Sequence, residues 1–416
     1  MTTRTATLQG VSASRGPARG LPVAGNQKLA GPESLTVRAQ KVAAVAAAHA
    51  AAVDSGSRFP AEAMAAAREQ RLLGVAVPPE FGGEGAGISE IADICYALGR
   101  ACASTAMVYA MHQTKVACLT RHGRSSPWHQ LLMRRICAEQ MLLASSTTEG
   151  DRGGDIRNST APIERQGARI ALERSATVIS YGEAADAIVT TARRSADAAS
   201  ADQVLVVLLK QDYTLEGQAG WDALGMRGTC SAGFKLTASA ASEQILPVAY
   251  EEIHARTMMP VAHQLWSSAW AGIAAAAVER TRAFVRKARQ RADGVLPPGA
   301  AQLTRANASL QKLRGLVAGA LQRFELAADD PVALESLDFQ TAMNLLKINA
   351  SELAVATVMS AMQASGLAGY RNDGEFSIGR HLRDILSAPI MINNDRILGN
   401  LGTASLLSSV PVSIRD

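Results

Sequence analysis

Apolar residues recur at helical spacing near both ends of this chain and at shorter, alternating spacing in its middle. In the first helical stretch, residues 35–140, we expect helices at Ser34–Val53, at Pro60–Leu73 and at roughly Ile88–Thr120. Ser34 is a suitable N-cap, and Pro60 lies near the first turn of its helix. A glycine-rich break, Pro78–Gly85, separates the second helix from the third.

The pattern changes near residue 141. From there to Leu246, short β-prone runs are separated by turns that contain Gly, Asp or Ser. The expected strands are Arg169–Glu173, Ala176–Ile179, Ala187–Thr191, Gln203–Leu209 and Gly233–Ala238. Runs of this length and spacing predict a small antiparallel β domain.

Helical spacing returns at Pro260 and continues almost to the end of the chain. Pro297 and Pro298 separate a first long helix from a second at Ala300–Ala328, and further helices are expected at Leu334–Ala364 and Ser377–Leu407. The predicted fold class is therefore mainly α with a central β domain. The expected parts are a disordered leader (1–33), an N-terminal helical domain (34–140), a β domain (141–248) and a C-terminal four-helix bundle (249–416).

The composition is typical of a globular protein. Of the 416 residues, 48% are hydrophobic and 19% are charged, which supports a large buried core. The net charge is +5 with scattered arginines, which argues against a nucleic-acid partner but suits an anionic substrate such as a CoA thioester. The five cysteines lack metal-ligand spacing, so we expect no metal site and a reduced, cytoplasmic protein.

Two segments bear on location. The leader lacks the continuous apolar core of a signal peptide, although its Arg, Ser and Thr content would also suit an organelle transit peptide. The longest apolar stretch, Val261–Val278, contains His263 and Gln264. We expect it to be a helix buried in the bundle rather than a membrane span.

Glycine-rich polar segments follow one another in a fixed order. Ala144–Asp155 (ASSTTEGDRGGD) places hydroxyl groups and glycines after an apolar run that predicts a strand, so a ligand can approach the backbone. Val178–Asp186, Gly225–Ser231 and Gln363–Asp384 follow it. Together with Pro78–Gly85, these segments resemble the acyl-CoA dehydrogenase family of flavoproteins. The resemblance covers roughly residues 35–410 and implies that family's fold.

The resemblance implies FAD as cofactor, with FMN or reduced flavin supplied by a reductase as the alternative. Thr148–Asp155 is similar to the family's TEPGAGSD. This match implies that Ser145, Thr147 and Thr148 face the pyrimidine edge of the isoalloxazine ring. Gly154 stands at the position of a serine that contacts the substrate.

Two further segments extend the implied cofactor site. In Val178–Gly182, which resembles WITNG, Ser180 keeps a hydroxyl group for flavin N5, and Val178 replaces a tryptophan that shields the ring. Gln363–Tyr370 is similar to QxxGGxGY, a segment that reaches the flavin pyrophosphate of a neighbouring subunit. The implied contacts are Gln363, Gly366 and Leu367, and the implied assembly is a homodimer or homotetramer.

The family's usual catalytic base is missing. Dehydrogenation of an acyl thioester needs a carboxylate that removes the α-proton. The register after Arg383-Asp384 places Ile392 at the glutamate position of most relatives. The alternative position, on the first bundle helix, is Ala262.

Other residues near these positions are candidates for a role in the site. In the segment after Ile392, Asn394 and Arg396 are assigned to the cofactor by the resemblance. We expect a substitute acid or base among His263, His112 and Asp395. The two histidines are also candidates for substrate contacts.

We therefore predict α,β-oxidation of an acyl thioester, carried by CoA or an acyl carrier protein, with an unconventional base. The sequence does not define the electron acceptor. A second hypothesis keeps the fold but changes the chemistry to a monooxygenase that uses reduced flavin and O2. A third is a catalytically inactive binding homologue. Acyl-thioester turnover, dependence on a flavin reductase and failure to bind flavin distinguish the three.

Overall fold

The computed structural model describes residues 33–149, 157–407, 410, 412 and 413. The predicted leader, 1–33, lies outside these residues except for Glu33. The helices that follow it are α1 (Leu35–Ser55), α2 (Ala61–Glu69), η1 (Pro79–Phe81), α3 (Ile88–Ala101), α4 (Ala103–His122) and α5 (Pro127–Glu139). Ser34 caps α1 as expected, because Val37 N donates to its hydroxyl oxygen at 3.4 Å.

The middle of the chain forms two sheets, ordered β1-β4-β5 and β2-β3-β7-β6. Their strands are β1 (Leu143–Ser146), β2 (Glu164–Gln166), β3 (Arg169–Ala176), β4 (Ala187–Arg193), β5 (Gln203–Leu209), β6 (Tyr213–Ala219) and β7 (Gly233–Ala241). The expected β region is confirmed, and all strand pairs are antiparallel except β1 with β4. The alternation pattern misses β2, β6 and this parallel pair. It also predicts a strand at Ala176–Ile179, where β3 in fact ends.

The expected helix Ile88–Thr120 is two helices. Cys102 has extended backbone angles (φ −150°, ψ 116°) and separates α3 from α4. No proline lies near this break, and the nearest glycine, Gly99, lies inside α3. α3 packs along α7 (Met259–Arg291), whereas α4 also contacts β1 and the turn η4 (Arg227–Thr229). Tertiary packing therefore decides the change of direction, which local propensity does not reveal.

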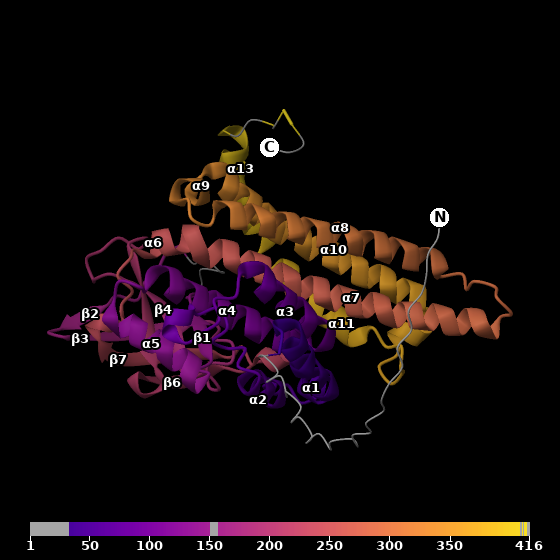
Figure 1. Cartoon of the computed structure of the whole chain (residues 1–416), viewed down its shortest axis with the longest axis horizontal. Helices are drawn as coiled ribbons and strands as arrows, with labels where there is room; N and C mark the ends of the chain where they lie inside the picture. The colour runs from indigo at the N-terminus through magenta and orange to yellow at the C-terminus, as the bar shows by residue number, and fades with distance from the viewer. Residues whose placement is uncertain (1–32, 150–156, 408–409, 411, 414–416) are drawn as a thin grey trace, which may run out of the picture. The chain divides into compact units, whose positions relative to one another are not determined.

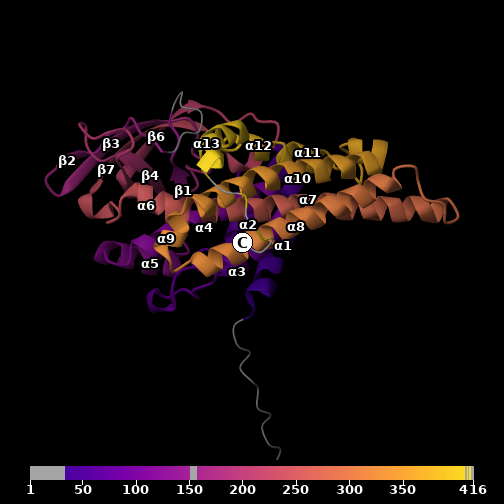
Figure 2. The same ribbon diagram turned by 90° about the horizontal axis from the view of Figure 1, so that it is seen from above.

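The last part of the chain is a helical bundle. Three long helices, α7, α8 and α10, pack against one another, and the strands gather at one end of them (Figures 1 and 2). The expected helix Ser377–Leu407 is broken into three short helices. In chain order the elements are α6 (Tyr250–Ile253), the π-helix η6 (His254–Met258), α7, α8 (Ala300–Ala327), α9 (Pro331–Glu335), α10 (Leu337–Tyr370), α11 (Gly379–Ile385), α12 (Ser387–Ile390) and α13 (Asn394–Leu407).

Helix α7 is the core of this arrangement. Every residue from Met259 to Val278 is buried, because α3, α4, α8 and α10 all pack on this helix. Glycines permit its closest crossing. A Cβ atom on Gly99 of α3 would lie 2.3 Å from Ala269 O, and one on Gly272 of α7 would lie 2.3 Å from Tyr96 O. The stretch predicted to be a buried helix, Val261–Val278, is therefore confirmed.

One described helix, α10, is long and apolar enough by composition alone to cross a membrane, and half of its most apolar window is buried in the protein. The domain boundaries given above stay predictions. The fold class, mainly α with a central β region and a helical bundle at the C-terminal end, is confirmed.

Candidate functional site

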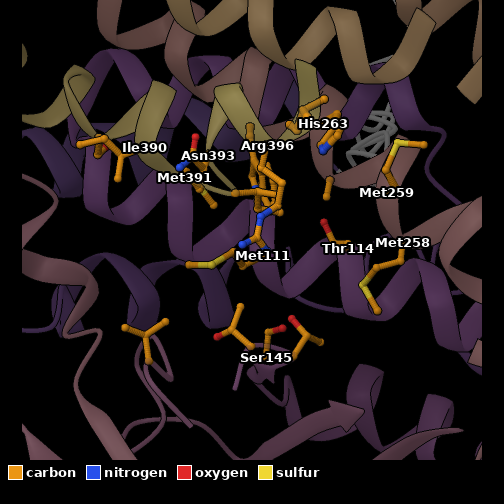
Figure 3. Close-up of a pocket in the computed structure, with 18 of the residues that line it drawn as sticks. Met111, Thr114, Ser145, Met258, Met259, His263, Ile390, Met391, Asn393 and Arg396 are labelled. Carbon is orange, nitrogen blue, oxygen red and sulfur yellow. The ribbon is translucent and has the colours of Figure 1, made fainter. Parts of the chain in front are cut away.

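A cavity of about 1040 Å³ lies between the β region and the helices (Figure 3). Its walls come from α4, from β1, from the segments that follow β3 and β6, and from η6 with the start of α7. The first turns of α10 and the region from α12 to α13 complete it. Segments far apart in the sequence thus meet at one site, and the sequence motifs contribute to most of its walls.

One wall carries hydroxyl groups from β1 and the residues after it. Ser145, Thr147 and Thr148 all line the cavity and are half-buried. Glu149 fixes the end of this segment, because Ser159 Oγ and Thr160 N each donate to its carboxylate at 2.6 Å.

The Glu149 carboxylate also meets a buried cation. Arg174 on β3 lies 3.5 Å from it. Burial raises the pKa of Glu149, but the charge of Arg174 and the hydrogen bonds outweigh this effect, and the net pKa is lowered. The anchored carboxylate therefore stays ionised and holds Thr147 and Thr148 at the cavity wall.

A second set of cavity-lining hydroxyl groups comes from Ser180, Ser231 and Thr229, which are joined by hydrogen bonds. Ser180 Oγ lies 2.7 Å from Ser231 Oγ, which lies 2.8 Å from Thr229 Oγ1. Thr229 donates its own hydrogen to Met226 O at 2.8 Å. Each hydroxyl has one hydrogen to donate. Ser180 must therefore donate to Ser231, and Ser231 must donate to Thr229. Ser180 lines the cavity with its lone pairs available, so it can accept a hydrogen bond from a ligand.

His263, a predicted catalytic and substrate-binding residue, lines the cavity on α7 and points into it (Figure 3). Its Nδ1 lies 3.0 Å from Met343 O and must donate, since a carbonyl oxygen only accepts. Nε2 is then the unprotonated nitrogen. Burial, with a smaller effect of the nearby Lys347 charge, lowers the pKa of His263 to about 3. The imidazole is therefore neutral and able to accept a proton.

Both expected glutamate positions lie at the cavity, and neither carries a carboxylate. Ala262 and Ile392 line it, as the register predicts. Ile392 has a φ of +54°, a left-handed conformation that is strained for a β-branched residue. Among the described lining residues the one carboxylate is Glu251 on α6, whose side chain is exposed.

His112 does not line the cavity, which corrects its assignment as a catalytic and substrate-binding candidate. Its Nε2 donates to Leu73 O at 2.8 Å, and its Nδ1 accepts from Leu143 N at 3.0 Å. Burial lowers the pKa of His112 to about 4, so the ring is neutral. Both ring nitrogens are used by the backbone, and His112 fixes the start of β1.

The segment around the missing glutamate also differs from expectation. Asp395 is exposed and lies outside the cavity lining, so it is not placed to act as a base. Asn394, a predicted cofactor contact, is buried away from the lining in a contact with Lys347. Its neighbour Asn393 lines the cavity instead, together with Arg396, whose side chain points into it (Figure 3).

The remaining predicted contacts occupy other places. Val178 lines the cavity beside Ser180. Gln363, Gly366 and Leu367 are exposed at the far end of α10 and do not line it. This position leaves them free to meet another subunit, which stays a prediction. Gly154 lies outside the described residues.

Several lining residues are missed by the motif comparison. The most notable are Lys115, Arg157, Trp221, Glu251, His254 and Trp266. Lys115 could have been noticed as a lysine on the apolar helix 103–122, and Trp221 and Trp266 as two of only four tryptophans. Their convergence, however, depends on how distant helices and loops pack.

The cavity also fits the flavin that the resemblance implies. Its volume is typical of cofactor sites, and hydroxyl groups line the wall that the motif comparison assigns to the ring. Trp266 Nε1 and Thr341 Oγ1 belong to lining residues and have no hydrogen-bond partner among the described residues. Buried polar atoms normally have partners, so a ligand is the expected one. No group of three or more His, Cys, Asp or Glu residues in the described chain is placed to hold a metal.

The fold and cavity define a protein of the acyl-CoA dehydrogenase type. FMN-bound TdsC, a dibenzothiophene monooxygenase from Paenibacillus sp. A11-2, superimposes with a TM-score of 0.79 at 17% identity and covers 91% of this chain and 98% of its own. A nitrososynthase from Micromonospora carbonacea var. africana gives 0.76 at 20% identity, covering 89% and 95%. At these identities the similarity establishes the fold.

The chain belongs to the acyl-CoA dehydrogenase family. The family's N-terminal domain model matches residues 35–134, and its C-terminal domain model matches residues 255–406. The resemblance read from the motifs is thereby confirmed, and membership of this family of flavoproteins supports a flavin cofactor.

Two relatives of named activity match parts of the chain. Cyclohex-1-ene-1-carbonyl-CoA dehydrogenase of Geobacter metallireducens is 30% identical over 181 residues, which are 43% of this chain and 47% of the relative. 3-Sulfinopropanoyl-CoA desulfinase of Paraburkholderia xenovorans is 29% identical over 120 residues, which are 29% of this chain and 30% of the relative. The match spans less than half the length of each relative.

Proposed function

We propose that this protein is a flavin-dependent oxidoreductase that dehydrogenates an acyl thioester, with His263 replacing the missing glutamate. The observation that carries the proposal is the state of His263. Its Nδ1–H is held by Met343 O, and its neutral Nε2 is left to accept a proton at the cavity, next to the Ala262 position. The names of both relatives contain a CoA thioester, which supports this substrate class.

In this proposal, one residue removes the proton and others bind the flavin. Nε2 of His263 takes the α-proton of the acyl group, and Met343 O keeps the ring in the tautomer that can do so. Ser145, Thr147, Thr148 and Ser180, which line the cavity, would hold the flavin ring through hydroxyl and backbone groups. A flavin bound there would supply the acceptor for the hydride that leaves the β-carbon.

The same burial that keeps His263 neutral makes its protonated form costly. The charge of Lys347 adds to this cost. A base with a low pKa accepts a proton from carbon less readily than one whose pKa lies near the working pH. The proposal therefore includes slow proton abstraction compared with a glutamate in the same place.

The proposal extends to cofactor form, assembly and location. FAD is favoured by the resemblance, and Gln363, Gly366 and Leu367 would reach the pyrophosphate of a second subunit. Leu367 and Tyr370, at this end of α10, are 72% and 74% exposed, which supports burial against another copy. A homodimer or homotetramer in the cytoplasm is the assembly we propose.

The test uses the purified protein, examined by its visible spectrum and then mixed anaerobically with a panel of acyl-CoAs and acyl carrier proteins. Bleaching of stoichiometric flavin and formation of the enoyl thioester would support the proposal. Tightly bound flavin that no thioester reduces would contradict it, and protein without flavin affinity would favour a binding homologue.

A second candidate is a monooxygenase that uses reduced flavin and O2. The specific observation in its favour is that neither Ala262 nor Ile392 supplies a carboxylate, since hydroxylation needs no such base. TdsC, whose fold this chain shares, is named as a dibenzothiophene monooxygenase. Oxygen consumption that requires a flavin reductase, with no anaerobic reduction by thioesters, would favour this candidate.

A further inference from the structure

The cavity contains a buried cation that the proposed reaction does not use. Lys115 on α4 is 4% exposed, yet it lines the cavity. Met111 and Thr114, which precede it at helical spacing, line the same wall (Figure 3). The lysine therefore belongs to the cavity-facing side of α4 and not to a solvated surface.

Lys115 has no counter-charge in the described part of the chain. Its polar neighbour among the described residues is a thioether, Met258 Sδ, which lies 2.8 Å from Nζ. A thioether is a weak acceptor, and no carboxylate contributes to the electrostatics of this lysine. The nearby Cys118 thiol has a pKa raised by burial, so it carries no negative charge at neutral pH.

Of the other titratable groups that line the cavity among the described residues, Glu251 is exposed and does not contribute to the electrostatics of Lys115. His254 and Arg157 line it as well. Burial first, and then the charges of Arg157 and Lys115, lower the pKa of His254 to about 4. The imidazole is therefore neutral. Lys115 is thus a positive charge in a place that burial makes unfavourable for it.

Lys347 shows how this chain satisfies a buried lysine that has only a structural role. Its Nζ donates to Asn394 Oδ1 at 2.6 Å and lies 3.5 Å from Pro389 O. Within the described ranges, Lys115 has no such oxygen acceptor. An uncompensated buried ammonium group is costly, and such groups concentrate where a ligand completes them.

We propose that Lys115 is a specificity-determining residue that binds an anionic group at the distal end of the acyl chain. The substrate class is then acyl thioesters that carry a second acid, such as a terminal carboxylate. This inference rests on the proposed function, because it assumes that an acyl group enters the cavity. A carboxylate would give Lys115 the counter-charge that the described residues do not supply, whereas a methyl end would not.

The test compares binding of chain-matched CoA thioesters by calorimetry under anaerobic conditions. Succinyl-CoA is paired with butanoyl-CoA, glutaryl-CoA with pentanoyl-CoA, and adipoyl-CoA with hexanoyl-CoA. For wild-type holoprotein we expect at least one dicarboxylic member to bind about 10- to 100-fold more tightly than its neutral partner. Lys115→Met should remove this preference and leave binding of the neutral partner within about threefold, while Lys115→Arg should retain part of it.

Lys235→Met is the matched control. Lys235 lies on β7 in an exposed ion pair with Glu173 and does not line the cavity, so the preference should survive its replacement. Equal binding of the two members of every pair to wild-type protein would overturn the inference. Persistence of the preference in a folded Lys115→Met variant, with its melting temperature as the check, would do the same.

Binding and flavin reduction separate the two proposals. If Lys115→Met abolishes a measured preference but no thioester reduces the flavin, the anionic subsite stands and the dehydrogenase proposal fails. If neutral acyl-CoAs reduce the flavin and no dicarboxylic member binds more tightly, the dehydrogenase proposal stands and the subsite fails.

Discussion

Lys347 Nζ donates a hydrogen bond to Asn394 Oδ1 at 2.6 Å and so joins α10 to the first residue of α13. Asn394 Nδ2 donates in turn to Ser351 Oγ at 3.1 Å. The Asn394 amide is therefore fully engaged away from the cavity. Asn393 and Arg396, on either side of it, line the cavity instead. The contact between Lys347 and Asn394 therefore decides which side chains of the segment can meet a ligand.

Removing the Asn394 side chain should destabilise the protein. In Asn394→Ala, the buried Lys347 ammonium loses its closest acceptor, which should lower the free energy of unfolding by about 2–3 kcal/mol. Urea denaturation measures this change. Asn349→Ala, on the exposed side of α10, the helix that carries Lys347, is the control and should change stability by less than about 0.5 kcal/mol. Equal effects of the two variants would contradict a structural role for the pair.

His263→Gln should slow proton abstraction. The variant keeps a polar side chain but lacks the imidazole base, so anaerobic flavin reduction by a reactive thioester should slow by about 10²- to 10⁴-fold. Stopped-flow absorbance measures the rate. His112→Gln tests the other histidine: it should lower stability through its contacts with Leu73 and Leu143, with the rate per folded molecule nearly unchanged. The reverse result would exchange their roles.

Ser231→Ala should shift the redox potential of the bound flavin. Ser231 accepts the hydrogen of Ser180, and this leaves Ser180 as an acceptor toward the cavity. An acceptor favours the reduced ring, which carries a hydrogen at N5. Without Ser231, the Ser180 hydroxyl no longer favours the reduced ring over the oxidised one. The midpoint potential should therefore fall by about 10–30 mV, equivalent to about 0.5–1.5 kcal/mol for a two-electron couple. Spectroelectrochemical titration measures it, and an unchanged potential would show that the hydroxyl chain does not orient Ser180.

The pH dependence of stability should reveal the buried charge of Lys115. Burial lowers the pKa of Lys115 to about 8 from its ordinary 10.5. Between these values the unfolded chain binds more protons than the folded one, so this residue makes wild-type stability rise with pH there. Lys115→Met should therefore be more stable than wild type below pH 8, by up to about 3 kcal/mol, and the advantage should shrink toward pH 10.5.

The comparison of the two proteins isolates this residue. Cys118 and Lys347 also titrate in the folded or unfolded chain near this range, but they are present in both proteins and largely cancel in the difference. Urea denaturation at several pH values is the measurement. A stability difference that does not vary between pH 8 and 10.5 would mean that Lys115 keeps its proton in the folded protein across this range, so that burial does not lower its pKa.

The sequence by itself determined the order of the structural elements. Helical spacing and the Ser34 cap located α1, and the run of Ala and other small residues after Pro260 predicted the buried core of α7. Motif register also placed Ala262 and Ile392 at the cavity, although neither can act as a base. These features are readable because they depend on residues that are neighbours along the chain.

The tertiary structure alone decided which side chains meet. Nothing in the local sequence separates His112 from His263, yet one is bound on both nitrogens by backbone groups and the other faces the cavity. Tertiary packing also decides the break at Cys102 and the presence of Asn393, rather than Asn394, at the cavity. In the part of the chain that the structure describes, Lys115 meets no counter-charge, because η6 brings Met258, and not a carboxylate, against α4. Such relationships join residues distant in sequence, and packing, not periodicity, sets them.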